Sequence, residues 1–139
     1  MSEFHYSSSN AIISNLSGIL IRMAHGYLEA AVFTVYGGDG IEVDDEFYPE
    51  AVAGAFLVCA GFLRRCGPDM IAAVDRGRGW SEIGSDIWFT QNGHGVGFWD
   101  RGLGDIGERL SDSARSLGEA YVVKTDGGKL TIEHDWSKV

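Results

Sequence analysis

The sequence predicts a single α+β domain, with N-terminal helices packed on a small, mostly antiparallel sheet of three to four strands. Two patterns predict this class. Apolar residues recur at helical spacing in the first half of the chain, and short apolar segments alternate around glycine-rich turns in the last third. A chain of 139 residues, 45% of them hydrophobic, suits one core. We expect one domain over residues 1–139, with residues 1–8 frayed.

Helical spacing governs the first half of the chain. The first expected helix carries an apolar stripe formed by Ile12, Ile13, Leu16, Ile19, Leu20 and Met23. A break is expected near Gly26, after which residues 27–35 form a further helix or, alternatively, a strand. Pro49 suits the first turn of a helix, and Gly67-Pro68 suits its end. The segments expected after Pro49 are a helix to about Arg65, a short helix over 69–74 and a loop over 75–85.

Two hairpins flank one helix in the expected order of the last third, β-β-α-β-β. The first hairpin turns at Asn92-Gly93, a strong hairpin signal, and pairs residues 86–90 with residues 96–99. The helix covers residues 103–117, and the second hairpin pairs 120–124 with 130–133. Alternation in the first hairpin predicts an inward set of Ile87, Phe89, Val96 and Phe98, with Trp88 and Trp99 on the opposite face.

Composition and charge exclude several functions. The chain has 20 acidic residues against 11 Lys and Arg, a net charge of −9, which disfavours direct binding to nucleic acid. No apolar run predicts a membrane span and no signal peptide is recognised, so a cytoplasmic protein is expected. Cys59 and Cys66 lie seven residues apart in one expected helix, about 10 Å, which is too far for a disulfide. We expect two buried thiols.

A cluster of acidic residues lies in the loop between the first two helical regions and comprises Asp39, Glu42, Asp44, Asp45 and Glu46. Its spacing does not match a calcium-binding loop, because Ile41 stands where the second carboxylate should be. The alternatives left open are a solvated loop, a docking patch for a basic partner, or mimicry of nucleic acid.

Two patterns in the last third could carry chemistry. Gly102-Leu103-Gly104-Asp105-Ile106-Gly107 matches the dinucleotide-binding pattern, but an antiparallel hairpin before it and an acid at the helix start favour a tight turn. His94 lies at the expected hairpin tip, with Asp100 and Arg101 at its base, and with His134 it could take part in acid–base or metal chemistry. Extended strands would separate His94 from Asp100 by about 15–20 Å. No catalytic residue, cofactor or metal ligand is therefore assigned.

The segment from Ser85 to Arg101 resembles a family of small bacteriophage and prophage proteins. The shared core is Phe-Trp-Leu-Thr-Arg-Asn-Gly-His-Gly-x-Gly-Phe-Trp-Asp-Arg, represented here by Ile87-Trp88-Phe89-Thr90-Gln91-Asn92-Gly93-His94-Gly95-Val96-Gly97-Phe98-Trp99-Asp100-Arg101. The resemblance extends over roughly residues 27–133 and departs from the family at Gln91, where the family usually has arginine. It implies a phage or prophage setting and no particular mechanism.

The leading hypothesis is a phage or prophage accessory protein that binds a host or phage protein and inhibits a nucleic-acid-binding defence protein. The expected binding residues are Asp39, Glu42, Asp44, Asp45, Glu46, Trp88, His94, Trp99, Asp100 and Arg101. One alternative is a small-ligand- or metal-binding enzyme centred on His94, Asp100 and Arg101. Another is a structural homo-oligomer, such as a homodimer built through exposed tryptophans.

Overall fold

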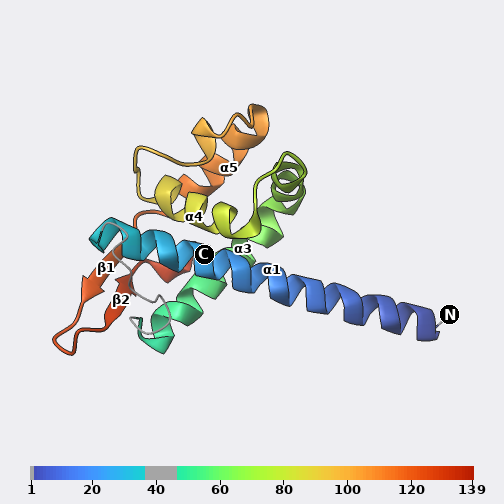
Figure 1. Cartoon of the computed structure of the whole chain (residues 1–139), viewed down its shortest axis with the longest axis horizontal. Coiled ribbons are helices and arrows are strands. Elements are labelled where there is room, and N and C mark those ends of the chain that lie inside the picture. The colour runs from blue at the N-terminus through green and yellow to red at the C-terminus, as the bar shows by residue number, and fades with distance from the viewer. Residues whose placement is uncertain (1, 37–46) are drawn as a thin grey trace.

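The protein is mostly helical and carries one small sheet (Figure 1). The structure, a computed structural model, describes the backbone of residues 2–36 and 47–139, and the side chains of residues 15–35 and 47–139. The elements, in order, are α1 (Ser2–Tyr36), α3 (Pro49–Asp75), α4 (Trp80–Gln91), the 3-10 helix η1 (Phe98–Asp100), α5 (Asp105–Arg115), β1 (Tyr121–Lys124), β2 (Leu130–Glu133) and the 3-10 helix η2 (Trp136–Lys138).

Helix α1 is continuous, so the predicted break near Gly26 and the alternative strand over 27–35 are both wrong. Gly26 serves packing instead of interrupting the helix. A Cβ atom at Gly26 would lie 1.8 Å from the carbonyl oxygen of Ser81, and one at Gly84 would lie 1.9 Å from that of Met23. These two glycines therefore let the backbones of α1 and α4 come into contact.

Helix α3 merges the two helices predicted on either side of Gly67-Pro68. It begins at Pro49, as predicted, and bends at Cys66, the residue with non-helical dihedral angles (φ −123°, ψ 15°). Cys59 and Cys66 are free, buried thiols, as expected. By length and composition α3 could cross a membrane, but here it is a core helix whose buried face includes Ala55, Val58 and Phe62.

The predicted first hairpin, residues 86–90 paired with 96–99, is wrong. Residues 80–91 form α4 and residues 98–100 form η1. Ile83, Ile87 and Gln91 recur every four residues and are all buried, which is helical periodicity. Asn92-Gly93 ends the helix, because Gly93 takes a positive φ of 69° and the His94 N–H donates to the Phe89 carbonyl, 2.9 Å away.

The sheet has two strands among the described residues, so the predicted three to four strands are wrong while the α+β character remains. The second predicted hairpin is confirmed: β1 and β2 pair antiparallel, with Tyr121 opposite Glu133 and Lys124 opposite Leu130. The predicted helix between the hairpins is confirmed as α5. A short parallel bridge joins Phe47 to Leu130, which attaches the residues before α3 to the sheet.

The core lies where α1, α3, α4 and α5 meet, and its largest members are aromatic. Tyr27 and Trp88 pack edge to face, with ring centroids 5.2 Å apart. Phe62 and Phe98 stack at 5.8 Å. Trp88 is only 2% exposed and is buried together with Ile87, so its predicted separation from Ile87 on opposite faces of a strand is wrong, because helical rather than strand geometry sets its direction.

Candidate functional site

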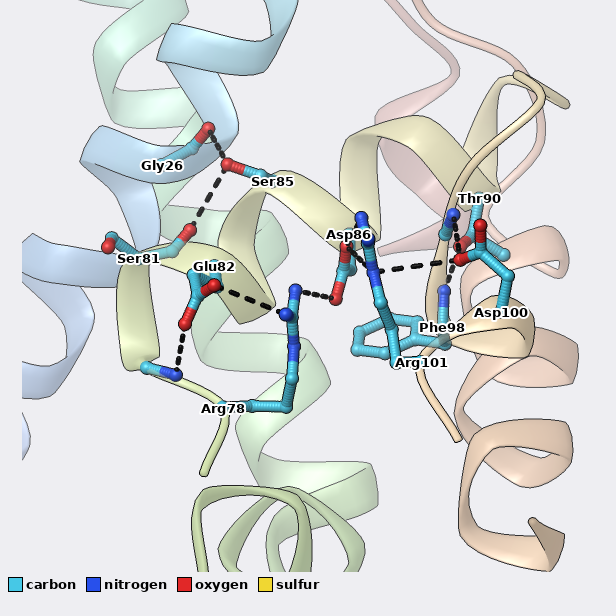
Figure 2. A network of polar contacts seen from close by, with 12 residues as sticks. Gly26, Arg78, Ser81, Glu82, Ser85, Asp86, Thr90, Phe98, Asp100 and Arg101 are labelled. Atoms are coloured by element: carbon cyan, nitrogen blue, oxygen red, sulfur yellow. Dashed lines mark hydrogen bonds and ion pairs between the residues drawn. The ribbon is translucent and has the colours of Figure 1, made fainter. Parts of the chain in front are cut away.

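The residues from Arg78 to Arg101 are anchored by a buried carboxylate (Figure 2). Asp86 on α4 is fully buried and accepts three hydrogen bonds. Nη2 of Arg78 lies 2.7 Å from Oδ2, while Nη2 and Nε of Arg101 lie 2.8 and 3.1 Å from Oδ1. Buried charges are stable when they are paired and hydrogen-bonded in this way. Asp86 therefore links the segment before α4 and the segment after it to the helix.

Asp100 and Arg101, two of the predicted binding residues, make bonds within the fold. The Gly97 N–H donates to Oδ1 of Asp100 at 3.1 Å, so Asp100 stabilises the start of η1. Arg101 is partly desolvated, which disfavours its charge, yet the hydrogen bonds and charge of Asp86 hold its pKa above the usual value. Both side chains thus have a structural role that the sequence did not reveal.

Three consecutive polar residues at the end of α4 hold the neighbouring segments. Thr90 Oγ1 accepts the Phe98 N–H at 3.1 Å. Gln91 accepts from the Tyr27 hydroxyl at 2.7 Å and donates to the Gly118 carbonyl at 3.0 Å, while Asn92 accepts from the Ala120 N–H at 2.8 Å. The C-terminal end of α4 is therefore bonded to α1, to η1 and to the segment that leads into β1.

The glycine pattern at residues 102–107 is explained by backbone geometry. Gly102 and Gly104 have φ values of 70° and 63°, a region that favours glycine. A Cβ atom at Gly107 would lie 2.9 Å from the Phe98 carbonyl oxygen. The pattern therefore serves the tight turn between η1 and α5, as the sequence predicts.

A hollow of about 320 Å³ opens where α1, α4 and β1 meet. Its lining residues are Thr34, Val35, Trp88, Asn92, His94, Glu119, Ala120, Tyr121 and Val122. Two of these residues, His94 and Tyr121, are exposed aromatic side chains. Beside the hollow, His94 and the exposed Phe33 both pack edge to face on Phe89, at 5.8 and 6.4 Å. We call this set of side chains, with the hollow, the His94 face.

One buried polar atom in the His94 face lacks a partner. The indole Nε1 of Trp88 is inaccessible to solvent and has no hydrogen-bond partner among the described residues. An indole N–H is a donor only, and burial without an acceptor costs about 1–3 kcal/mol. Glu119 also belongs here: its Oε2 accepts the Tyr121 hydroxyl, a hydrogen bond that raises the pKa of Tyr121. The hollow thus combines a carboxylate with aromatic rings, and the buried N–H of one lining residue is unpaired.

The predicted binding residues that the structure describes do not gather on one surface. Trp99 is 51% exposed, but it borders a different hollow with Glu108, Ser111, Asp112 and Arg115, which shares no lining residue with the hollow of the His94 face. The acidic residues Asp39, Glu42, Asp44, Asp45 and Glu46 lie outside the described residues. Tyr121, Glu119 and Phe33 were not singled out from the sequence, because their proximity to His94 depends on the tertiary fold.

Comparison with known proteins found no matching family model, no matching curated protein and no matching solved structure. Within the described parts of the chain, no group of three or more His, Cys, Asp or Glu residues is placed to hold a metal ion. His134 makes a contact of its own, since its ring packs edge to face on Trp136 at 5.0 Å. The His94 face is therefore the candidate functional site.

Proposed function

We propose that this protein acts by binding another protein through the His94 face, as an accessory factor of a bacteriophage or prophage in the host cytoplasm. The observation that carries the proposal is the set of exposed apolar side chains gathered around one hollow. Phe33, Val35 and Tyr121 are 54%, 45% and 57% exposed. Exposed aromatic residues that cluster around a concavity are typical of protein interfaces.

The charge of the chain indicates the kind of partner. The net charge is −9, and the acidic residues between Asp39 and Glu46 directly follow the end of α1, which bears Phe33 and Val35. An acidic segment joined to an aromatic face suits a basic protein surface, through steering and charge complementarity. A nucleic-acid-binding defence protein presents such a surface, so the proposed role is inhibition of a defence protein. The resemblance of residues 85–101 to phage proteins supports this setting.

Photo-crosslinking in bacterial cells that produce this protein tests the proposal. Benzoylphenylalanine replaces Phe33 on the His94 face in one variant and Ile71 on α3 in the control. The two side chains are matched in exposure, at 54% and 55%. A discrete adduct is expected from position 33 and not from position 71. Its yield should fall several-fold when Tyr121→Ser is added, or when Asp44→Asn, Asp45→Asn and Glu46→Gln are added together.

The outcomes separate the alternatives. Equal adducts from both positions, or none from position 33, would contradict binding through this face. An adduct of twice the chain mass would instead favour the homodimer. The enzyme alternative is not carried forward, because Asp100 and Arg101 are bonded to Gly97 and Asp86 within the fold.

A further inference from the structure

We infer that the protein has a second docking surface, which binds a lysine- or arginine-containing segment of a protein partner next to Trp99. A hollow of about 340 Å³ opens at this place, and it is lined by Trp99, Glu108, Ser111, Asp112 and Arg115. We call these residues and the hollow the Trp99 surface. It shares no lining residue with the hollow of the His94 face, so the inference goes beyond the proposed function and does not depend on it.

The fold fixes the residues on both sides of Trp99 (Figure 2). Before it, Phe98 is buried in the core, and its N–H donates to Oγ1 of Thr90 at 3.1 Å. After it, Arg101 donates two hydrogen bonds to the buried carboxylate of Asp86. The side chain of Trp99 itself is 51% exposed. The turn therefore presents this indole at the surface while its neighbours hold the backbone in place.

Two glycines allow this turn to pack closely against α4 and α5. A Cβ atom at Gly97 would lie 2.2 Å from Oγ1 of Thr90. One at Gly107 would lie 2.9 Å from the Phe98 carbonyl oxygen. An aromatic side chain on a preordered backbone loses little conformational freedom on binding, and tryptophan is enriched among the residues that contribute most to protein interfaces. Trp99 is therefore suited to anchor a partner.

The unbalanced charge beside Trp99 is negative. Glu108 and Asp112 lie four residues apart on α5, and both line the hollow. Among the described residues of this lining, Arg115 is the one cation, and it lies 3.8 Å from Asp112. Like charges at a spacing of four residues destabilise a helix, and an acid in the last turn opposes the helix dipole. Helix stability alone therefore does not account for Asp112 beside Glu108.

An aromatic ring beside carboxylates suits a basic side chain. A guanidinium or ammonium group is attracted to the face of an indole and forms charge-assisted hydrogen bonds with carboxylates. A second copy of this chain would bring the same acidic helix against its own, and nucleic acid would bring phosphates, so both are repelled here. The charge therefore favours a protein segment that bears lysine or arginine.

An NMR titration with a defined peptide tests the inference. The chain has four tryptophans, and Trp99→Phe identifies the indole ¹⁵N–¹H signal of Trp99. The probe is acetyl-Ala-Ala-Arg-Ala-Ala-amide, and the matched control carries citrulline, which has nearly the shape of arginine but no charge. We expect a saturable shift of the Trp99 signal with the arginine peptide. The citrulline peptide should bind about tenfold more weakly, because it forms neither the cation–aromatic contact nor the ion pair.

Three substitutions separate this surface from general charge attraction and from the His94 face. Glu108→Gln should weaken binding of the arginine peptide about two- to fivefold, the range of an exposed ion pair. Asp126→Asn removes the same charge from the turn between β1 and β2 and should leave binding unchanged. Tyr121→Ser, which alters the His94 face, should also leave it unchanged. All three side chains are exposed, so these variants should fold.

Four results would overturn the inference: no shift of the Trp99 signal, equal binding of the two peptides, equal weakening by Glu108→Gln and Asp126→Asn, or weakening by Tyr121→Ser. If the arginine peptide binds at Trp99 but position 33 gives no adduct, the Trp99 surface stands and the proposed function is wrong. If position 33 gives the expected adduct but the peptide does not shift the Trp99 signal, the proposed function stands and this inference is wrong.

Discussion

Two sides of α4 bury polar groups in opposite ways. Asp86 and Trp88 are two residues apart, so they project from opposite sides of the helix. On one side, Asp86 is fully buried and three hydrogen bonds from Arg78 and Arg101 satisfy it. On the other, Trp88 is 2% exposed, yet its N–H has no partner among the described residues, and the residue borders an open hollow. A buried donor left unpaired is the costlier arrangement for the fold. The contrast indicates that the Asp86 side maintains structure, whereas the Trp88 side borders the His94 face.

The largest expected effect comes from a substitution that prevents the close approach of the α1 and α4 backbones. Gly84→Ala would place a methyl group 1.9 Å from the Met23 carbonyl oxygen, so α1 and α4 must separate. We expect the free energy of unfolding to fall by about 3 kcal/mol or more, measured by urea denaturation. The control is Gly18→Ala on α1, where nothing lies within 4 Å of the added methyl group. That substitution should stabilise the helix by about 0.5–1 kcal/mol. Equal effects would refute a close helix contact.

This contact also shows what the sequence could predict and what it could not. Local patterns were sufficient for α5, for the β1–β2 hairpin and for the start of α3 at Pro49, since each depends on turn residues or apolar spacing within a few positions. Gly26 was interpreted as a helix break, because single-sequence reasoning cannot see that Ser81 lies against it. Its use as a packing position follows from a contact with a residue 55 positions away in the sequence.

The misread hairpin has a related cause. Asn92-Gly93 satisfies the turn signal, and Trp88-Phe89-Thr90 has high strand propensity, so a strand was the favoured local interpretation. The spacing of Ile83, Ile87 and Gln91 also fits a helix, but that helix buries a glutamine. Burying a glutamine is unfavourable unless its amide is hydrogen-bonded, and here Tyr27 and Gly118 provide those bonds. Tertiary partners therefore decided the local structure.

Removing the buried carboxylate is the next largest test. Asp86→Asn keeps the shape of the side chain but removes the buried counter-charge that Arg78 and Arg101 share, leaving them only Glu82 at 3.1 Å and Asp100 at 3.6 Å, respectively. Breaking a buried pair costs about 3–5 kcal/mol. Because the two arginine side chains are 18% and 26% exposed and retain some hydration, we expect a loss of about 2–3 kcal/mol in urea denaturation. A loss comparable to that of the exposed-pair variant Asp69→Asn would show that Asp86 does not anchor this region.

Deleting first a bonded and then an unpaired polar group sharpens the contrast. Tyr27→Phe removes the hydroxyl that donates to Gln91 and leaves a buried acceptor unpaired, which should cost about 1–2 kcal/mol. Trp88→Phe removes a donor that is already unpaired, so the relief of that cost offsets part of the lost ring burial, and the net change should stay within about 1 kcal/mol. Thermal and urea unfolding measure both. A Trp88→Phe loss well above that of Tyr27→Phe would show that its N–H has a partner in the folded protein.

The smallest expected effect concerns an exposed counterpart of the Asp86 pair. Arg109 on α5 donates two hydrogen bonds of 2.9 Å to Asp69 on α3, and these bonds hold the pKa of Asp69 below its usual value. A lowered carboxyl pKa stabilises the fold at pH values above the usual one, about 3.9, and this contribution disappears as the pH falls through the lower folded value. Carboxyl ¹³C titration should therefore show Asp69 titrating at higher pH in Arg109→Gln than in the native protein. The matched variant Arg115→Gln, on the same helix, should leave the Asp69 titration unchanged.

Because both partners are near the surface, added salt should narrow the difference between native protein and Arg109→Gln, whereas the cost of Asp86→Asn should persist in salt, since Asp86 is fully buried. If salt weakened both pairs equally, Asp86 would be accessible to solvent and would not anchor this side of α4.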